Sequence, residues 1–385
     1  MTKQSTTRYW AVSRVLLLLA MAASAWVAPV HASEIQIFQV APLTGVLAST
    51  GQQMVLGGKL YFQWVNDNGG INGAKIKHIV VDDGYKVDET VRLTKEALDK
   101  PDVVALFGFA GTANISKLLS EGVLEAGGAP LVAPYTGGEA LRSPFNPYIF
   151  HVRAGYADET EHMVHQVATL GMSRIAVMYQ NDAFGKAGLA GVEAAVAKRK
   201  MTLVAAAPYE RNTDQVQDAV KQIKASDAQA VIMISVNRST AAFAKAYREA
   251  KGAAQLYNIS VVDPAELVKL AGLPAVHGLG ISQVVPYPFM ANKPAVREYQ
   301  ALLKKYGDGQ AISYTSFEEF LGAKVLVEGL RRAGPNPTRS KLIKALETMG
   351  NYDLGGTSVS FSPNNRIGSR YVEVTVIGGA GKLLR

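Results

Sequence analysis

The stretch that decides the fold is residues 35–84, IQIFQVAPLTGVLASTGQQMVLGGKLYFQWVNDNGGINGAKIKHIVVDDG. A strand is predicted at 35–40, a helix ending at Asn66 follows, and a second strand ends at 81–83. This βαβ opening predicts parallel strands. The loop 41–51 between the first strand and the helix holds small, hydroxyl and glycine residues, and no catalytic side chain. Such a loop suits a surface that closes around a small molecule.

Residues 1–32 have the pattern of a cleavable export signal. Three basic residues precede an apolar run at 15–25, and a small-x-small site ends at Ala32. The apolar run is shorter than the about 20 residues that a membrane-spanning helix needs, although an uncleaved anchor is the alternative. We expect cleavage after Ala32 and exclude this segment from the fold.

Composition narrows the class of protein. The chain has 385 residues and no cysteine, which excludes disulfides, a lipid-attachment cysteine, and zinc-finger, iron–sulfur or thiol chemistry. We therefore expect a soluble periplasmic protein that is not a lipoprotein. The net charge is +8, but the basic triplet at 198–200 has no interleaved aromatic residues. Nucleic-acid binding is therefore not expected, and the length favours two domains.

Short apolar runs alternate with amphipathic segments through most of the chain. Near-continuous apolar strands are predicted at 103–107, 174–179 and 230–234, which is typical of strands buried on both faces of a parallel sheet. Helices are predicted at 213–225 and 314–332, where apolar residues recur at helical spacing. The alternation predicts an α/β fold of the doubly wound type.

The alternation occurs twice. One set of βα units covers 35–150 and a second covers 174–285, with proline-marked breaks at 143–148 and 286–288. The helices predicted within 293–332 have no sheet of their own nearby in sequence. They must return to one of the two existing sheets, so we expect the chain to cross between two lobes more than once.

Several short motifs carry a resemblance to a known family. They are PLTG at 42–45 with Gly51, NGGING at 68–73 leading to VDD at 81–83, GFAGT at 108–112, PYTG at 134–137, DAFG at 182–185 and AKVLVEGL at 323–330. Because these motifs occur in this order, the chain resembles the type I periplasmic solute-binding proteins of ABC importers, in the leucine/isoleucine/valine-binding protein branch. The resemblance covers essentially all of the chain after the signal.

The resemblance implies two doubly wound, Rossmann-like lobes joined by three crossovers, with a ligand cleft between the lobes. We assign residues 33–153 with 286–350 to lobe 1, and 154–285 with 351–385 to lobe 2. The implied function is a monomeric, non-catalytic binding component, without a cofactor, that delivers a solute to an ABC permease and ATPase complex in the inner membrane. An enzyme on the same fold and a sensory module that presents its closed form to a receptor are the alternatives.

Two predicted strand ends suit an anion. Gly111 and Thr112 follow one strand, and Thr136 and Gly137 follow another, so glycine backbone and hydroxyl groups meet where two helices are predicted to begin. The alternative is that both threonines are helix N-caps and the glycines are turns. The resemblance places the carboxylate-binding hydroxyl at Thr112, with backbone contacts from Tyr135 to Gly137. Ala110 and Gly111, directly before Thr112, are also predicted to be ligand-binding residues.

The chain departs from the amino-acid-binding members of the family at the walls of the cleft. The residues aligned with those walls are Thr50, Phe184, Asn237 and Phe317, and Tyr135 and Tyr156 are further aromatic residues that would suit a flat or apolar acid. At the position of the acidic residue that pairs with a ligand ammonium group, this chain has Ser260 or Val261, with Asp263 shortly after. An unpaired buried ammonium group is costly. We therefore expect an aromatic or apolar organic acid, and a branched-chain amino acid is the alternative.

Other candidate sites are weaker. His162 and His165 lie near acidic residues but no third metal ligand is evident, so we expect no metal site. Asp82 and Asp83 are adjacent on a strand and should point to opposite faces. Asp182 is expected to cap a helix. The sequence also contains neither a Gly-x-Ser-x-Gly elbow nor a phosphate-binding Gly-Lys-Ser/Thr loop.

Overall fold

The computed structural model describes residues 34–385, so the expected export signal lies outside the described residues. A five-stranded, all-parallel sheet has the order β2-β1-β3-β4-β5. Its strands are β1 (Glu34–Ala41), β2 (Lys75–Asp82), β3 (Val103–Phe107), β4 (Leu131–Val132) and β5 (Ile149–Phe150). The helices between these strands are α2 (Ala48–Asp67), α3 (Val87–Leu98), α4 (Thr112–Ser120) and α5 (Val123–Gly127), with short 3-10 helices η1 (Gly45–Leu47) and η2 (Glu139–Leu141).

A second sheet has seven strands in the order β14-β13-β10-β9-β8-β6-β7. Five of them are parallel, and β13 and β14 are antiparallel to their neighbours. The strands are β6 (Arg174–Gln180), β7 (Thr202–Tyr209), β8 (Ala230–Ile234), β9 (Gln255–Asn258), β10 (Gly280–Gln283), β13 (Glu373–Ile377) and β14 (Leu383–Leu384). Its helices are α6 (Tyr156–Thr169), α7 (Ala183–Lys198), α8 (Gln217–Lys224), α9 (Asn237–Glu249), α10 (Pro264–Ala271) and α11 (Leu273–Val276).

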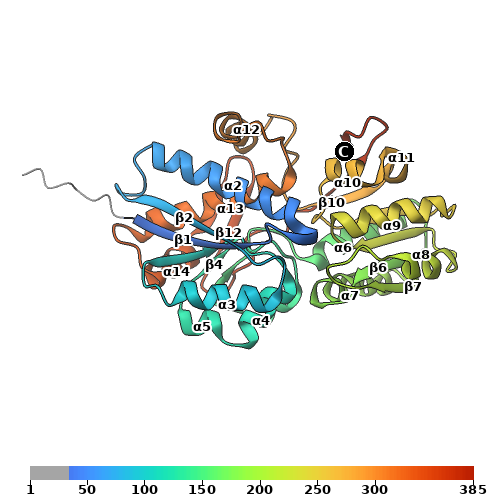
Figure 1. Ribbon diagram of the computed structural model, residues 1–385, viewed down its shortest axis with the longest axis horizontal. Helices are drawn as coiled ribbons and strands as arrows, with labels where there is room; N and C mark the ends of the chain where they lie inside the picture. The colour runs from blue at the N-terminus through green and yellow to red at the C-terminus, as the bar shows by residue number, and fades with distance from the viewer. Residues whose placement is uncertain (1–33) are drawn as a thin grey trace, which may run out of the picture. The chain divides into compact units, whose positions relative to one another are not determined.

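We call the five-stranded sheet with its helices the first lobe, and the seven-stranded sheet with its helices the second lobe. The chain crosses between the two sheets three times, after β5, after β10 and before β13. The helices that follow β10 are α12 (Pro294–Tyr306), α13 (Tyr314–Ala333) and α14 (Arg339–Glu347). They return to the first lobe, where α13 lies along α2 and α14 contacts β3 (Figure 1).

A small hairpin precedes the third crossing. It consists of β11 (Gly350–Asp353) and β12 (Ser358–Phe361), and its Phe361 ring packs edge-on against Phe150 of β5, with 5.4 Å between ring centroids. The sequence-based boundary at residue 350 therefore falls at the start of this hairpin. The chain next joins the second sheet at β13, so the third crossing follows the hairpin.

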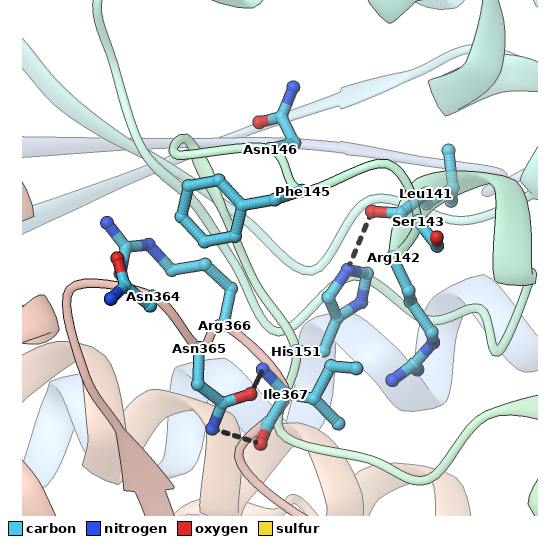
Figure 2. Close-up of a pocket in the computed structure, with 10 residues that line it drawn as sticks. All are labelled: Leu141, Arg142, Ser143, Phe145, Asn146, His151, Asn364, Asn365, Arg366 and Ile367. Carbon is cyan, nitrogen blue, oxygen red and sulfur yellow. Dashed lines mark hydrogen bonds between the residues drawn. The ribbon is translucent and has the colours of Figure 1, made fainter.

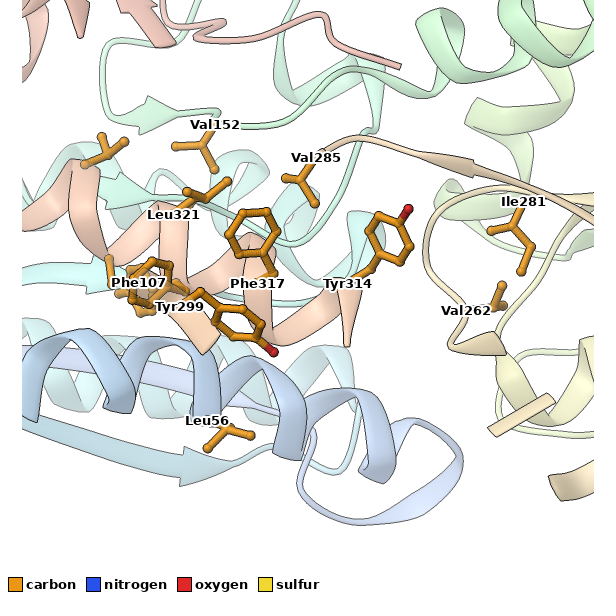
Figure 3. Close-up of a cluster of buried hydrophobic side chains, with 14 of the residues drawn as sticks. Leu56, Phe107, Val152, Val262, Ile281, Val285, Tyr299, Tyr314, Phe317 and Leu321 are labelled. Atoms are coloured by element: carbon orange, nitrogen blue, oxygen red, sulfur yellow. The ribbon is translucent and has the colours of Figure 1, made fainter. Parts of the chain in front are cut away.

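Burial explains why the apolar runs became strands. Every residue of β3 and β8 is buried, because helices cover both faces of each sheet. In the first lobe, α13 fills the space beside β3, and Phe317 packs on Tyr299 with 5.1 Å between ring centroids (Figure 3). No helix within residues 34–385 is long and apolar enough to cross a membrane.

Two local expectations differ from the structure. The helix expected after Gly138 is only the three-residue η2. The helix predicted from 213 begins at Gln217, after an irregular segment.

Candidate functional site

A small cavity of about 20 Å³ lies between the lobes, at the carboxyl ends of the parallel strands. Loops in this position form the usual ligand crevice of open α/β sheets. All nine lining residues are apolar, aromatic or glycine. The first lobe contributes Leu47, Tyr85, Ala110, Gly111 and Tyr135, and the second lobe contributes Tyr156, Phe184, Val236 and Val261.

Aromatic rings form one wall of the cavity. The Tyr156 and Phe184 rings meet at 66° with 5.5 Å between centroids, and both residues are buried. Tyr135 completes this wall, and its hydroxyl is hydrogen-bonded to the Thr315 hydroxyl at 3.0 Å. The polar end of Tyr135 is therefore satisfied away from the cavity, which leaves ring faces to contact a ligand.

The two predicted anion loops lie side by side at one end of this wall. The Thr112 and Thr136 hydroxyls are hydrogen-bonded at 2.7 Å, and the Gly138 N–H donates to the Thr136 hydroxyl at 3.2 Å. Gly111 is the N-cap of α4, and Thr112 is its first residue and makes no capping hydrogen bond. The N-cap interpretation therefore does not describe Thr112. Both hydroxyls are buried beside the free N–H groups at the start of α4.

Gly137 joins this shelf to the second lobe. A Cβ atom at Gly137 would lie 2.7 Å from the Tyr156 backbone nitrogen, so a larger residue does not fit. The Tyr156 N–H donates to the Gly137 carbonyl at 2.8 Å. This close approach holds the loop after β4 against the start of α6.

Six of the predicted residues do not line the cavity: Thr50, Thr112, Thr136, Gly137, Asn237 and Phe317. Asn237 donates to the Thr50 hydroxyl at 3.3 Å, and this contact joins the two lobes beside the cavity. Phe317 lies in the core of the first lobe against Tyr299 and Phe320, as Figure 3 shows for Tyr299. The helical position of Phe317 directs its ring into the space between α12 and α13.

Four lining residues were not predicted as ligand contacts: Leu47, Tyr85, Val236 and Val261. Tyr85 and Val236 each follow a strand end, so the carboxyl-end rule could have found them. Val261 lies at the position that lacks an acidic group. Leu47 is the last residue of η1, in a loop that is otherwise rich in glycine and hydroxyl residues.

No carboxylate lines the cavity. Val261 occupies its wall, and Asp263 instead caps α10 by accepting a hydrogen bond from the Glu266 N–H at 2.9 Å. Asp158 accepts from the Gly155 N–H at 3.1 Å and pairs with Arg370 at 3.0 Å. An ammonium group in the cavity would therefore lack a carboxylate partner.

A buried ion cluster lies directly behind the aromatic wall. The Arg153 guanidinium is 0% exposed and pairs with Glu159 at 2.9 Å and with Glu318 at 3.3 Å. The guanidinium carbon of Arg153 lies 5.2 Å from the Tyr135 ring centroid and 5.8 Å from the Tyr156 ring centroid. Because Arg153 is in the first crossing, Glu159 on α6 and Glu318 on α13, the cluster links both lobes at a hinge position.

Burial raises the pKa values of two glutamate side chains in and beside this cluster. Burial raises the pKa of Glu318 to about 7, although the Arg153 guanidinium opposes the rise. Burial, followed by the charge of Glu318, raises the pKa of Glu319 well above its ordinary value. Both carboxyl oxygens of Glu319 lack a hydrogen-bond partner, so Glu319 is best accommodated in its neutral form.

Glu319→Gln should weaken the dependence of stability on pH. The unfolded chain ionises Glu319 near pH 4.5, whereas the folded chain retains the proton, so stability falls as pH rises above that value. The loss is up to about 1.4 kcal/mol per pH unit while only the unfolded chain is ionised. Urea unfolding at pH 5 and pH 8 should show a smaller decrease for Glu319→Gln than for the wild type. Glu96→Gln, at an exposed position on α3, is the control, and parallel pH profiles for all three proteins would refute the assignment.

A larger hollow of about 250 Å³ lies within the first lobe, near His151, Arg142 and Arg366 (Figure 2). Arg142 Nε and Nη1 and His151 Nδ1 are buried without a hydrogen-bond partner, whereas other polar groups of the hollow are bonded elsewhere. Arg366 donates to the Pro147 and Ser362 carbonyls and to Glu347, and His151 is hydrogen-bonded to the Leu141 carbonyl at 3.1 Å. No residue of the second lobe lines this hollow, so the smaller cavity between the lobes is the better candidate for the site.

The other candidate residues have structural roles. Asp182 caps α7 by accepting from the Phe184 and Gly185 N–H groups. Asp82 accepts hydrogen bonds from the N–H groups of Leu43 and Thr44, whereas Asp83 is buried. His162 and His165 are exposed on α6. Within residues 34–385, no group of three or more histidine, aspartate or glutamate residues is arranged to hold a metal ion.

Comparisons with known proteins agree with the two-lobe fold. The family model described as periplasmic binding protein matches residues 34–382. A curated protein of Brucella abortus named Leu/Ile/Val-binding protein homolog 8 is 24% identical over 376 residues, which cover 92% of this chain and 91% of that protein.

Two solved structures are similar over nearly the whole described chain. A substrate-binding periplasmic protein from Ralstonia solanacearum is 39% identical, with a TM-score of 0.87, and the match covers 91% of this chain and 99% of that chain. A branched chain amino acid ABC transporter structure from Thermus thermophilus with bound valine is 18% identical, with a TM-score of 0.81, and the match covers 91% of this chain and 95% of that chain. At this identity, the similarity to the Thermus thermophilus structure concerns the fold alone.

Proposed function

Because this chain belongs to the periplasmic binding protein family, with the two-lobe type I fold, we propose that it captures a small carboxylate-bearing solute between its lobes. The observation that carries the proposal is the cavity itself. It combines an aromatic wall with an adjacent shelf of hydroxyl and N–H groups, and it lacks a carboxylate. The preferred ligand is an aromatic or apolar organic acid without an amine.

In this proposal the carboxylate binds at the shelf formed by Thr112, Thr136 and the Gly137 backbone. The hydroxyls and the N–H groups at the start of α4 can donate to an anion without an arginine. The apolar part of the solute contacts Tyr135, Tyr156 and Phe184. Other residues of the proposed site are Thr50, Ala110, Gly111 and Asn237, which are buried around the same cleft.

Binding by lobe movement follows from the size of the cavity. A volume of about 20 Å³ has room for about one water molecule, far less than an aromatic acid needs. The lobes therefore separate to admit the solute, and the side chains that line the cavity move apart when the lobes close around it, with the three crossings as hinges. We further propose that the protein acts as a monomer in the periplasm after signal cleavage. It then delivers the solute to an ABC permease and ATPase complex without catalysing a reaction.

Calorimetric titration with a panel of ligands tests the proposed ligand class. The panel contains leucine, phenylalanine, benzoates and phenylacetates. We expect one or more aromatic acids to bind more tightly than the amino acids, because an ammonium group would be desolvated without a partner. An apolar slot distinguishes one methylene by about 1–3 kcal/mol, so several related acids should bind.

The same titration can contradict the proposal. Micromolar or tighter binding of leucine with no response to any aromatic acid would favour a branched-chain amino acid as the solute. The names of the curated relatives make this the principal alternative. The transport role would then stand, and the assignment of an amine-free acid would fall.

A further inference from the structure

Arg211 of the second lobe makes charged hydrogen bonds to the first lobe across the cleft, and it does not itself line the cavity. It lies in the loop after β7 of the second lobe and is 16% exposed. Its Nη2 donates to the Tyr85 carbonyl at 2.7 Å and to Asn114 Oδ1 at 2.8 Å, and both residues belong to the first lobe. Its guanidinium carbon also lies 3.7 Å from the Tyr85 ring centroid.

Each partner of Arg211 is held in place by its own lobe. Asp182 accepts from Arg211 Nη1 at 2.6 Å and also caps α7, so the guanidinium is oriented from the second lobe. The Asn114 amide donates to the Thr90 hydroxyl at 2.7 Å, which directs its carbonyl oxygen toward Arg211. Little rearrangement is needed when the lobes meet, and such preorganisation reduces the entropic cost of closing.

Apart from the Arg153 cluster at the hinge, two polar contacts near the cavity join the lobes over longer distances. Asn237 reaches the Thr50 hydroxyl at 3.3 Å, and Gln180 reaches the Tyr85 hydroxyl at 3.5 Å. Both join neutral groups at long distances, whereas the two hydrogen bonds from Arg211 carry a charge. Charge-assisted hydrogen bonds are the stronger class. Separation of the lobes would break the contacts of Arg211 with Tyr85 and Asn114 but not its pair with Asp182.

We propose that Arg211 is a latch that stabilises the closed arrangement of the lobes without touching the solute. Tyr85 lines the cavity and Arg211 does not, so Arg211 acts on binding through the closing equilibrium. This inference rests on the lobe closure in the proposed function. If the solute binds the closed form, the apparent Kd is the intrinsic Kd divided by the closed fraction. Loss of the latch therefore weakens every ligand by the same factor.

Arg211→Met tests the latch, because methionine keeps much of the aliphatic length and removes the charge and the donors. The matched control is Arg238→Met, on the same lobe, whose side chain is half exposed and pairs with Asp214 at 2.7 Å. We expect Arg211→Met to raise the Kd of each acid that binds in the panel by a common factor of about ten. The control should leave every Kd unchanged, and circular dichroism should show both variants folded.

Small-angle X-ray scattering without ligand gives a second readout that does not depend on the solute. We expect ligand-free Arg211→Met to have a larger radius of gyration than the wild type and Arg238→Met. Equal radii together with unchanged Kd values would overturn the latch. A Kd increase for one acid alone would also overturn it, because that result indicates direct ligand contact. If no acid in the panel binds, the proposed ligand class fails, whereas the scattering comparison still decides the latch.

Discussion

Arg153→Met should lower the free energy of unfolding by about 3–5 kcal/mol at pH 8. The substitution leaves Glu159 and Glu318 buried with no cation between the lobes. Glu159 would keep its hydrogen bonds from the Ser260 N–H at 2.8 Å and the Ser282 hydroxyl at 2.6 Å, but these do not neutralise its charge. Urea unfolding monitored by circular dichroism measures the change.

The loss should be smaller at pH 5, because the unpaired carboxyl groups can then be protonated in the folded protein. Arg92→Met is the matched control, since Arg92 is about half exposed and pairs with Glu89 and Glu96 on the surface of α3. That variant should lose less than about 1 kcal/mol. A loss of similar size for both variants, or a loss for Arg153→Met that is independent of pH, would contradict the role given to the cluster.

Val236→Trp should reduce solute affinity by at least about a hundredfold. Val236 lines the cavity from the second lobe, at the N-cap of α9. An indole ring cannot fit in about 20 Å³, so it would occupy the ligand space or prevent the lobes from closing. The fold should survive with a cost of about 1–3 kcal/mol, the usual range for overpacking, because the new ring can lie in the open cleft.

Titration of Val236→Trp with the acids that bind the wild type measures the effect. Leu270→Trp is the control, because Leu270 is 42% exposed on α10 of the same lobe and lies outside the cavity. It should bind as the wild type does. Wild-type affinity in a folded Val236→Trp protein would mean that the solute binds elsewhere.

Much of the architecture could be predicted because local patterns and the buried sheet agree. The continuous apolar runs at 103–107 and 230–234 became β3 and β8, and the helix predicted at 314–332 is α13. The expectation that the later helices return to an existing sheet is confirmed by the contacts of α13 with α2. The predicted membership of the periplasmic binding protein family is also confirmed by the match to residues 34–382.

The site was less predictable, because it depends on which residues two separate lobes bring together. Phe317 carries the same aromatic signal as Phe184, yet helix phase directs it into the core. Tyr85 and Arg211 meet only through packing of loops that are 126 residues apart. Arg153 could be seen in sequence as a basic residue at a crossing, but its burial with two glutamates depends on α6 and α13 approaching it together.

The crystal structure of the complex with the tightest-binding acid of the panel tests the central claim most directly. We expect the acid between the two lobes, with its carboxylate at Thr112, Thr136 and the Gly137 backbone. Its apolar part should contact Tyr135, Tyr156 and Phe184. A ligand seated instead in the hollow beside His151 and Arg366, or held by one lobe alone with the other turned away, would contradict the account.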